Sequence, residues 1–284
     1  MAKPIVNIQY LRAALSLLIV AFHTGVNFHT PIPTGEGRTA LFFILSGFLF
    51  WRITVNQEGV AVRFLLRRAA RLIPLYWLVT LVVFGASRVG LSHRAPVSIE
   101  DLWQSLLFMP HVDDRTGLIV PILQPGWILD YEIPFCAVFA LGLLLREDRR
   151  FWVLTGLLGS LVTVGAFFNL TDPALITYTR PLLLEFLAGI WLARLWSGKS
   201  LPIWLCGGLL VIGAAVFFSL PMMGLKSLPP MIAAGPPAFL CVVGGLGLER
   251  AHWPTIRWLK QIGDASYSIF LWHIPVIVGM TFVL

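Results

Sequence analysis

Long apolar segments, separated by short gaps that hold most of the charged residues, constrain this chain more than any other feature. Residues 200–225 and 227–248 each contain no charged side chain. Hydrophobic residues make up 57% of the 284 positions and charged residues 12%, whereas soluble domains carry about 25% charged residues. A soluble core could not bury so much apolar side chain, so the sequence predicts a polytopic membrane protein.

A membrane-spanning helix needs about 20 predominantly apolar residues. By that criterion we predict an all-α transmembrane bundle of about nine to ten helices, in one domain over residues 1–284 because neither a repeat nor a linker is visible. The predicted helices are 5–26, 39–52, 72–89, 127–145, 151–169, 180–197, 201–220, 231–248 and 263–283. Residues 99–109 are too short to span and are expected to lie in the membrane interface or to re-enter the membrane.

The gaps between these segments alternate in basic content. Lys and Arg, Arg150 among them, concentrate in alternate gaps, which the positive-inside rule makes cytoplasmic. The N-terminus is therefore predicted to be cytoplasmic and the C-terminus to lie outside. The net charge of +7 therefore indicates membrane orientation and not nucleic-acid binding, which needs a clustered basic surface with aromatics. The first segment resembles a signal peptide, but it lacks a small-x-small cleavage site and is expected to be retained. The three cysteines form no C-x-x-C pair, so neither a metal site nor a disulfide framework is predicted.

Ionisable residues inside a membrane are costly and are candidates for function. Arg12 and His23 are eleven residues apart, which in an α-helix gives about 20° of rotation and about 16 Å of axial separation. One face of the first helix is thus predicted to carry a cation near its inner end and an imidazole near its outer end. The alternative is that Arg12 reaches the inner headgroups and His23 lies at the outer interface.

A second cationic group precedes the predicted third helix. Arg68 and Arg71 are three residues apart and would share one helix face at the inner boundary of the membrane, with Arg67 adjacent. Guanidinium groups bind phosphate oxygens in a bidentate manner, so this group suits a phosphorylated ligand. An anchor to anionic lipid is the alternative.

Buried carboxylates and a second histidine complete the candidates. Glu132 lies about a turn and a half into the predicted fourth helix, at roughly the expected depth of His23. Its carboxylate could orient the His23 imidazole, which would then act as a catalytic base. Asp130 could orient His23 in the same way or cap the helix. Glu185 is expected to form an ion pair. His273, near the bilayer centre, is a further candidate because hydrocarbon offers it no partner.

These segments, in this order, resemble the integral-membrane acyltransferase family 3. The motifs that carry the resemblance are Leu11-Arg12 followed by His23, Leu41-Phe-Phe-Ile-Leu-Ser-Gly-Phe-Leu-Phe, Phe64 to Tyr76 with its Arg-x-x-Arg, Trp127 to Glu132, Arg180-Pro-Leu-Leu-Leu-Glu-Phe-Leu-Ala-Gly, and Ser266-Tyr-Ser-Ile-Phe-Leu-Trp-His. Members of the family O-acylate bacterial cell-surface and exported polysaccharides. They usually have a further helix after the last motif, so this chain is expected either to be truncated or to be a compact variant.

The resemblance implies a multi-pass protein of the bacterial inner membrane that uses acyl-CoA, with acetyl-CoA expected, and a glycan acceptor. It implies that Arg12, His23 and Glu132 are catalytic, and that Arg68, Arg71 and Arg67 bind the donor. His273, Trp127 and Asp130 are additional site candidates, and Glu185 is expected to be structural. The acceptor sugar and the oligomeric state do not follow from the sequence.

In the expected reaction, His23 removes a proton from an acceptor hydroxyl, or is itself acylated and passes the acyl group on. The segment 90–126 is a candidate lid or sugar platform, on which Trp103 could stack. A proton-coupled secondary transporter that uses the same buried Arg, His and Glu residues is the rival interpretation. Against it, the chain lacks the paired, Gly/Pro-broken helices of such carriers.

Overall fold

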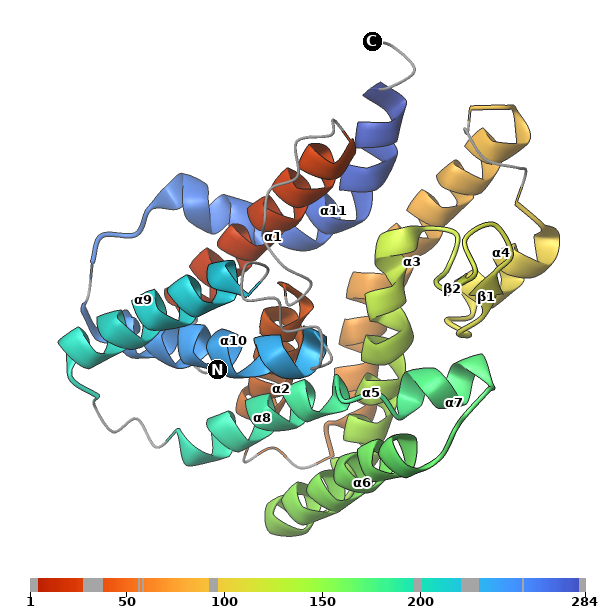
Figure 1. The fold of residues 1–284 in the computed structure, drawn as a ribbon. Coiled ribbons are helices and arrows are strands. Elements are labelled where there is room, and N and C mark those ends of the chain that lie inside the picture. The colour runs from red at the N-terminus through yellow and green to blue at the C-terminus, as the bar shows by residue number, and fades with distance from the viewer. Residues whose placement is uncertain are drawn as a thin grey trace. The chain divides into compact units, whose positions relative to one another are not determined.

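The computed structural model describes residues 5–27, 38–55, 57, 59–91, 97–196, 201–220, 230–251 and 253–280. It is almost entirely helical (Figure 1). The chain divides into two compact units that are interleaved in sequence. Unit 1 holds residues 1–55 and 181–269, and unit 2 holds residues 56–180 and 270–284. A single domain over residues 1–284 stays a prediction.

Unit 1 contains five helices and the first part of a sixth. They are α1 (Val6–Asn27), α2 (Arg38–Thr54), α8 (Leu183–Leu195), α9 (Ile203–Ser219), α10 (Pro230–Leu248) with the short 3₁₀ helix η2 (Glu249–Ala251), and α11 (Arg257–Met280) as far as Ile269. Helix α2 packs on α8 and α10, and α9 packs on α10.

The contact between α2 and α8 is unusually close because a glycine of each helix faces backbone of the other. A Cβ atom on Gly47 would overlap the carbonyl oxygen of Phe186. On Gly189 it would overlap the carbonyl oxygen of Ile44 and lie 2.7 Å from the amide nitrogen of Phe48. Small residues let helix backbones approach each other in membrane proteins, and this pair fixes the core of unit 1.

Unit 2 is built on a long helix and shorter elements beside it. They are α3 (Ala61–Arg88), α4 (Ile99–Leu106), the strands β1 (Val112–Asp113) and β2 (Leu118–Ile119), the 3₁₀ helix η1 (Gln124–Ile128), α5 (Leu129–Gly142), α6 (Glu147–Phe167), α7 (Pro173–Tyr178) and the end of α11. The two strands form an antiparallel ribbon in which Val112 pairs with Ile119. Helix α7 starts where sequence chemistry favours it, because Asp172 caps it and Pro173 occupies its first turn.

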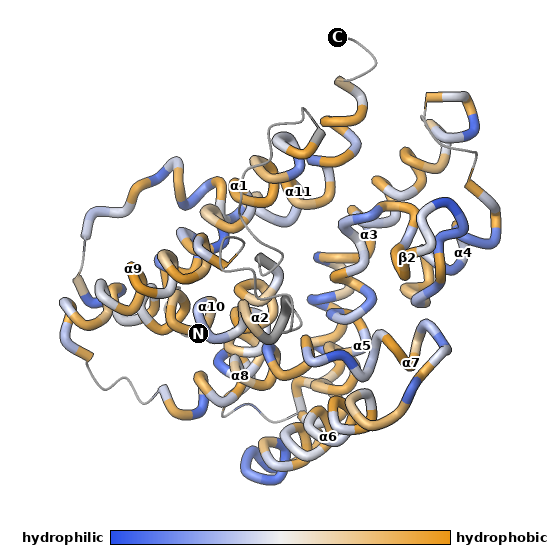
Figure 2. The backbone as a smooth tube through the Cα atoms, in the orientation of Figure 1, coloured by the Kyte–Doolittle hydropathy of each residue, from blue (hydrophilic) through white to orange (hydrophobic). Residues whose placement is uncertain are grey.

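Five helical segments of the described chain are long and apolar enough to cross a membrane. They are Val6–Val26, Ala61–Arg88, Glu147–Phe167, Pro173–Leu195 and Arg257–Met280, and α2 and α9 are shorter apolar helices. Figure 2 shows that hydrophobic residues dominate the helices, while hydrophilic residues gather at the start of α6 and around the two strands. This confirms the predicted all-α membrane protein.

Each of the nine predicted helices corresponds to a helix of the structure, within the described residues. The largest difference is at α3, which begins at Ala61 and not at residue 72. The arginines expected before this helix therefore lie within it. Residues 99–106 form the separate short helix α4. Residues 197 and 281–283, at the ends of two predicted helices, lie outside the described part of the chain.

Candidate active site

Helix α1 carries two of the predicted catalytic residues and is firmly held in unit 1. The first amide groups of an α-helix lack partners within the helix. Here the Glu249 carboxylate accepts hydrogen bonds from the amides of Val6 and Asn7, at 2.9 and 2.8 Å. A negative charge at this end is also favourable to the helix dipole. One turn further along, a Cβ atom on Gly263 of α11 would overlap the carbonyl oxygen of Gln9, so α11 lies directly against α1.

Arg12 points toward α11. Its Nη2 donates a hydrogen bond of 2.8 Å to Oγ of Ser266, and its Nη1 lies 3.4 Å from Oε1 of Gln9. Ser266 belongs to the last family motif, but nothing in its sequence position indicated a role for it. Its contact with Arg12 joins two motifs that are 254 residues apart.

His23 lies eleven residues beyond Arg12 in the same unbroken helix. The two side chains therefore emerge from one face of α1, separated by about 16 Å along the axis. The imidazole is partly exposed and meets the ring of Phe22 edge-on, with 5.1 Å between ring centroids. The observed helix therefore places Arg12 and His23 on one face, as the sequence spacing predicts.

Unit 2 contains the predicted donor-binding arginines and Glu132. Arg68 Nη1 lies 3.8 Å from Oε1 of Glu132, and their side chains are 15% and 2% exposed. The guanidinium also lies over the ring of Phe64, at 5.9 Å. Arg67 and Arg71 are exposed on the same helix, and Arg71 lies one turn beyond Arg68.

The pairing of Arg68 with Glu132 corrects the expected depths of these residues. Arg68 was placed at the inner boundary and Glu132 near the outer end of its helix, yet both lie at one level. The reason is that α5 runs antiparallel to α3 and begins beside its middle. Phe139 contacts Phe64, at 5.4 Å between ring centroids, whereas Gly126 lies against the ring of Tyr76.

The three additional candidates also lie in unit 2. Trp127 in η1 is half-buried and meets Tyr131 edge-on at 5.8 Å. Asp130 is buried, and its Oδ1 has no hydrogen-bond partner among the described residues. His273 is buried, with Nδ1 2.6 Å from the carbonyl oxygen of Phe270. Because a carbonyl only accepts, that contact places a proton on Nδ1.

Two buried charged residues differ from what the sequence predicted. Glu185 was expected in an ion pair, but neither carboxylate oxygen has a hydrogen-bond partner within the described residues, although the side chain is buried. Arg150 was interpreted as a basic residue of an inner gap. It is instead buried, with its guanidinium 5.7 Å from the ring centroid of Phe139 and its stem against Gly142. Sequence spacing gave no signal for either arrangement.

The predicted site residues therefore fall into two groups. Arg12 and His23 belong to unit 1, and Arg68, Arg71 and Glu132 belong to unit 2. Within the described ranges, no group of three or more His, Cys, Asp or Glu residues is arranged to hold a metal ion. The chemical groups present are an arginine and a histidine on one helix face, and a cationic helix with a buried carboxylate partner.

Comparisons with known proteins agree with the motifs. The chain is 35% identical over 260 residues to the exopolysaccharide production protein ExoZ of Rhizobium meliloti (strain 1021), covering 89% of this chain and 80% of ExoZ. It is 24% identical to the peptidoglycan O-acetyltransferase OatA of Listeria monocytogenes, over 99% of this chain but only 51% of OatA. It is 27% identical to the putative membrane-bound transacylase BcsY of Komagataeibacter xylinus, over 98% of this chain and 74% of BcsY.

No solved structure matches the chain. The family described as an acyltransferase domain matches residues 5–284, a range that contains every motif on which the resemblance rests. The protein therefore belongs to the membrane acyltransferase family 3.

Proposed function

We propose that this protein is an O-acyltransferase of the bacterial inner membrane. It transfers an acyl group, expected to be acetyl, from cytoplasmic acyl-CoA to a hydroxyl of a cell-surface or exported polysaccharide, or of its lipid-linked precursor. The names of the relatives support a glycan acceptor, because they concern exopolysaccharide production and peptidoglycan O-acetylation. The family match supports the acyl transfer.

The observation that carries the proposal is the placement of Arg12 and His23 on one face of an unbroken helix, within a chain matched by an acyltransferase family over residues 5–284. An imidazole is suited to proton transfer near neutral pH. A fixed guanidinium further along the same face is suited to binding an anionic part of the acyl-CoA donor. Together they supply a proton-transfer group and a contact for the donor on one helix face.

In the first route, His23 is a general base. It takes the proton of the acceptor hydroxyl while that oxygen attacks the carbonyl carbon of the thioester. The carbon–sulfur bond then breaks, and the departing CoA thiolate takes the proton from the imidazolium. One ester and one free thiol are formed, and His23 returns to its starting state. Arg12, held by Ser266 and about 16 Å from His23 along the helix axis, helps to hold the acyl-CoA donor.

In the second route, His23 itself attacks the thioester carbonyl. CoA leaves as the thiol, and the acyl group stays on an imidazole nitrogen until the acceptor hydroxyl displaces it. The two routes differ in one measurable way. Only the second leaves radioactivity on the protein when acetyl-CoA labelled in the acetyl group is supplied without acceptor.

Donor binding is assigned to α3. Arg68, Arg71 and Arg67 contact the phosphates of acyl-CoA, since guanidinium groups bind phosphate oxygens strongly. Glu132 has a clear role within this unit, because it holds the Arg68 guanidinium. Orientation of His23 by Glu132 stays a prediction. Trp127, Asp130 and His273 are candidates for further substrate contacts.

The test is acyl-CoA consumption by the full chain in lipid nanodiscs, given acetyl-CoA and an envelope glycan extract. Free CoA and acetylated glycan are measured for the wild type, for His23→Ala and for Leu17→Ala. Leu17 is exposed on the same helix and is about 120° away from His23 around its axis, so Leu17→Ala is the matched control.

We expect both products from the wild type and the control and neither from His23→Ala. If no acyl-CoA is consumed across several donors and glycan extracts, the proposal is wrong. The buried Arg, His and Glu residues would then be tested as a transport pathway. If His23→Ala retains full activity, acyl transfer stands but its assignment to His23 fails.

A further inference from the structure

The short helix α4 turns a stripe of apolar side chains outward. Ile99, Trp103 and Leu107 follow each other at intervals of four residues and are 59%, 59% and 60% exposed. Ser105, on the other side of the helix, is fully buried. On a protein that faces water, the apolar stripe of such a helix turns inward. The outward stripe indicates that the medium beside α4 is apolar.

The backbone carbonyls at the C-terminal end of α4 accept hydrogen bonds from groups of the protein. The last four carbonyls of a helix lack partners within it. In α4 those of Trp103 and Gln104 accept from the amides of Leu107 and Met109, at 3.0 and 2.9 Å. The carbonyl of Ser105 accepts from the hydroxyl of Tyr76, and that of Leu106 from the indole nitrogen of Trp77.

Side-chain donors at a helix C-terminus matter most where water is scarce. In lipid, every backbone polar group must find a partner within the protein. Tyr76 and Trp77 are both on α3, one of the helices apolar enough to cross a membrane. The C-terminal end of α4 is therefore attached to a helix face that itself belongs in the bilayer.

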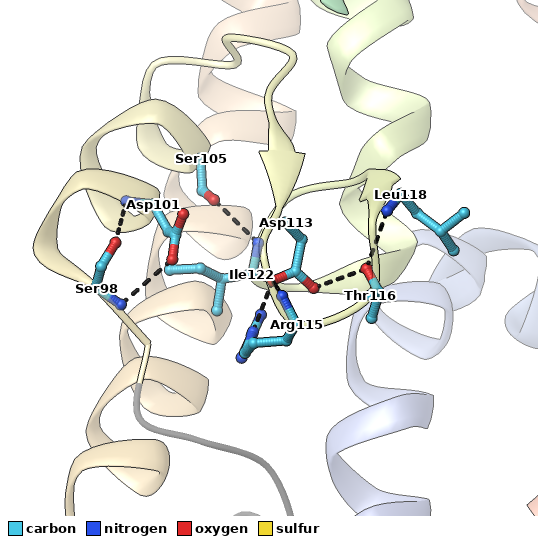
Figure 3. Close-up of polar contacts among 8 residues, drawn as sticks. All are labelled: Ser98, Asp101, Ser105, Asp113, Arg115, Thr116, Leu118 and Ile122. Atoms are coloured by element: carbon cyan, nitrogen blue, oxygen red, sulfur yellow. Dashed lines mark hydrogen bonds and ion pairs between the residues drawn. The ribbon is translucent and has the colours of Figure 1, made fainter.

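The N-terminal end of α4 has the opposite character. Figure 3 shows the capping box in which Ser98 Oγ accepts from the Asp101 amide at 2.9 Å, and Asp101 accepts from the Ser98 amide at 3.3 Å. Glu100 and Gln104 are hydrogen-bonded to each other on the exposed flank of the stripe. This end carries the charges and suits the headgroup layer.

The exposed stripe is also continuous with the outer face of α3. Trp77, Leu78, Leu81 and Val82 are exposed large hydrophobic residues of α3, and Trp77 is hydrogen-bonded directly to α4. A surface of this kind on a membrane helix faces acyl chains. The stripe of α4 extends that surface sideways from the spanning helix.

We propose that α4 is a lipid-facing helix beside the middle of α3, whose Ile99, Trp103 and Leu107 side chains contact acyl chains. Its charged N-terminal end lies toward the headgroup layer and its C-terminal end lies deeper. Trp103, one turn from the charged end, suits this position because indole rings favour the membrane interface. The occupant of the stripe is lipid and not a sugar or a second protein.

This attachment reaches the start of α5. Ser105 Oγ accepts a hydrogen bond from the amide of Ile122 at 3.0 Å (Figure 3). Tyr76, which holds the Ser105 carbonyl, also contacts Gly126 with its ring. Anchoring α4 in lipid thus fixes the segment that leads into Trp127 and the helix of Glu132.

The test uses spin labels on single introduced cysteines in the full chain, in nanodiscs of phosphatidylcholine and phosphatidylglycerol. Ile99→Cys, Trp103→Cys and Leu107→Cys place a label on the stripe, and Glu100→Cys and Gln104→Cys are matched controls on the flank. The native cysteines Cys136, Cys206 and Cys241 are buried, and the unsubstituted chain gives the labelling background. Each label is probed with oxygen, which concentrates in acyl chains, and with a polar nickel chelate, which stays in water.

We expect the ratio of oxygen to nickel accessibility to be severalfold higher at all three stripe positions than at both flank positions. Equal ratios, or higher nickel accessibility on the stripe, would overturn the proposal because the stripe would then face water. Immobilisation of the stripe labels by added glycan, without high oxygen accessibility, would indicate a sugar platform and equally overturn it. Should Trp103→Cys fail to fold, Ile99→Cys and Leu107→Cys decide the matter, because they lie on the same face.

Discussion

The guanidinium of Arg68 and the carboxylate of Glu132 form a largely buried ion pair, with 3.8 Å between Nη1 and Oε1. The pair joins α3 to the first turn of α5. It connects a cationic helix proposed to bind the donor with a carboxylate that was expected to serve the histidine. Glu132 therefore has a partner within its own unit that does not involve His23.

Removing one member of this pair is expected to be costly. Glu132→Gln leaves the Arg68 guanidinium without its counter-charge, and breaking a buried pair costs about 3–5 kcal/mol. Without its partner the Arg68 side chain would be less well positioned for the donor. We therefore expect KM for acyl-CoA to rise more than kcat falls. Thermal unfolding and steady-state kinetics measure both effects. Arg67→Gln, at an exposed neighbour, should leave unfolding unchanged; an equal loss there would contradict a specific role for the pair.

The close approach of α2 and α8 predicts strong sensitivity to a single added methyl group. Gly47→Ala and Gly189→Ala each place a Cβ atom against backbone of the facing helix, and overpacking of this kind costs about 1–3 kcal/mol or more. Gly156→Ala in α6 is the control, because nothing lies within 4 Å of its added Cβ. Thermal unfolding in detergent should separate the two sites from the control. Unchanged melting of Gly189→Ala would show that the helices are not in this contact.

Ser266→Ala tests whether the hydrogen bond to Arg12 has a role in catalysis. Loss of one hydrogen bond to a charged group is worth about 1.5–3 kcal/mol, so we expect kcat/KM for acyl-CoA to fall while the chain stays folded. The neighbouring Ser268→Ala is the control. If Ser266→Ala has wild-type kcat and KM, orientation of Arg12 by this hydroxyl is not needed.

Acid should weaken the turn between β1 and β2 through Asp113. Burial alone would raise the pKa of this carboxyl, but hydrogen bonds from Arg115 and Thr116 outweigh burial and hold the pKa below its usual value (Figure 3). Because the pKa is lower in the folded state than in the unfolded state, the Asp113 carboxylate stabilises the folded chain. That stabilisation is complete at pH values above the unfolded-state pKa of about 3.9. It is lost as the pH falls through the folded-state pKa.

The measurement is thermal unfolding of the wild type and Asp113→Asn between pH 3 and pH 7. The wild type should melt higher above about pH 4.5, and the difference should shrink below about pH 4. Asp114→Asn is the control, since Asp114 is exposed beside it. A difference that is constant down to pH 3 would contradict the role of the Asp113 carboxylate.

Substitution of Glu185 is expected to have the opposite effect on stability from substitution of Glu132. A buried carboxylate without a hydrogen-bond partner lowers the stability of the folded chain. Neither carboxylate oxygen of Glu185 has a hydrogen-bond partner among the described residues. Glu185→Gln is therefore expected to leave the unfolding temperature unchanged or raise it. A large destabilisation would show that the expected ion pair exists. Reduced activity in a stably folded Glu185→Gln variant would instead give this residue a role in the reaction.

Much of the architecture could be predicted because it depends on local sequence. The lengths of apolar segments predicted nine helices, and each has a counterpart in the structure. The spacing of Arg12 and His23 placed both on one face, since helix geometry is the same for any sequence. The motifs predicted the family, which the comparison over residues 5–284 confirms.

The partners of the buried charges could not be predicted in this way. Glu132 contacts Arg68 only because α5 begins beside the middle of α3, and that level is set by how residues 97–128 pack against α3. Ser266 meets Arg12 because Gly263 lets α11 approach α1.

Local sequence is thus enough to predict which segments are helices, which side chains share a face and which family the chain belongs to. Tertiary packing sets which cation meets which carboxylate and which face of α4 turns outward. Helix periodicity is a property of the local backbone and is readable from spacing. Contacts between helices depend on their relative level and separation, which the packing of residues distant in sequence sets.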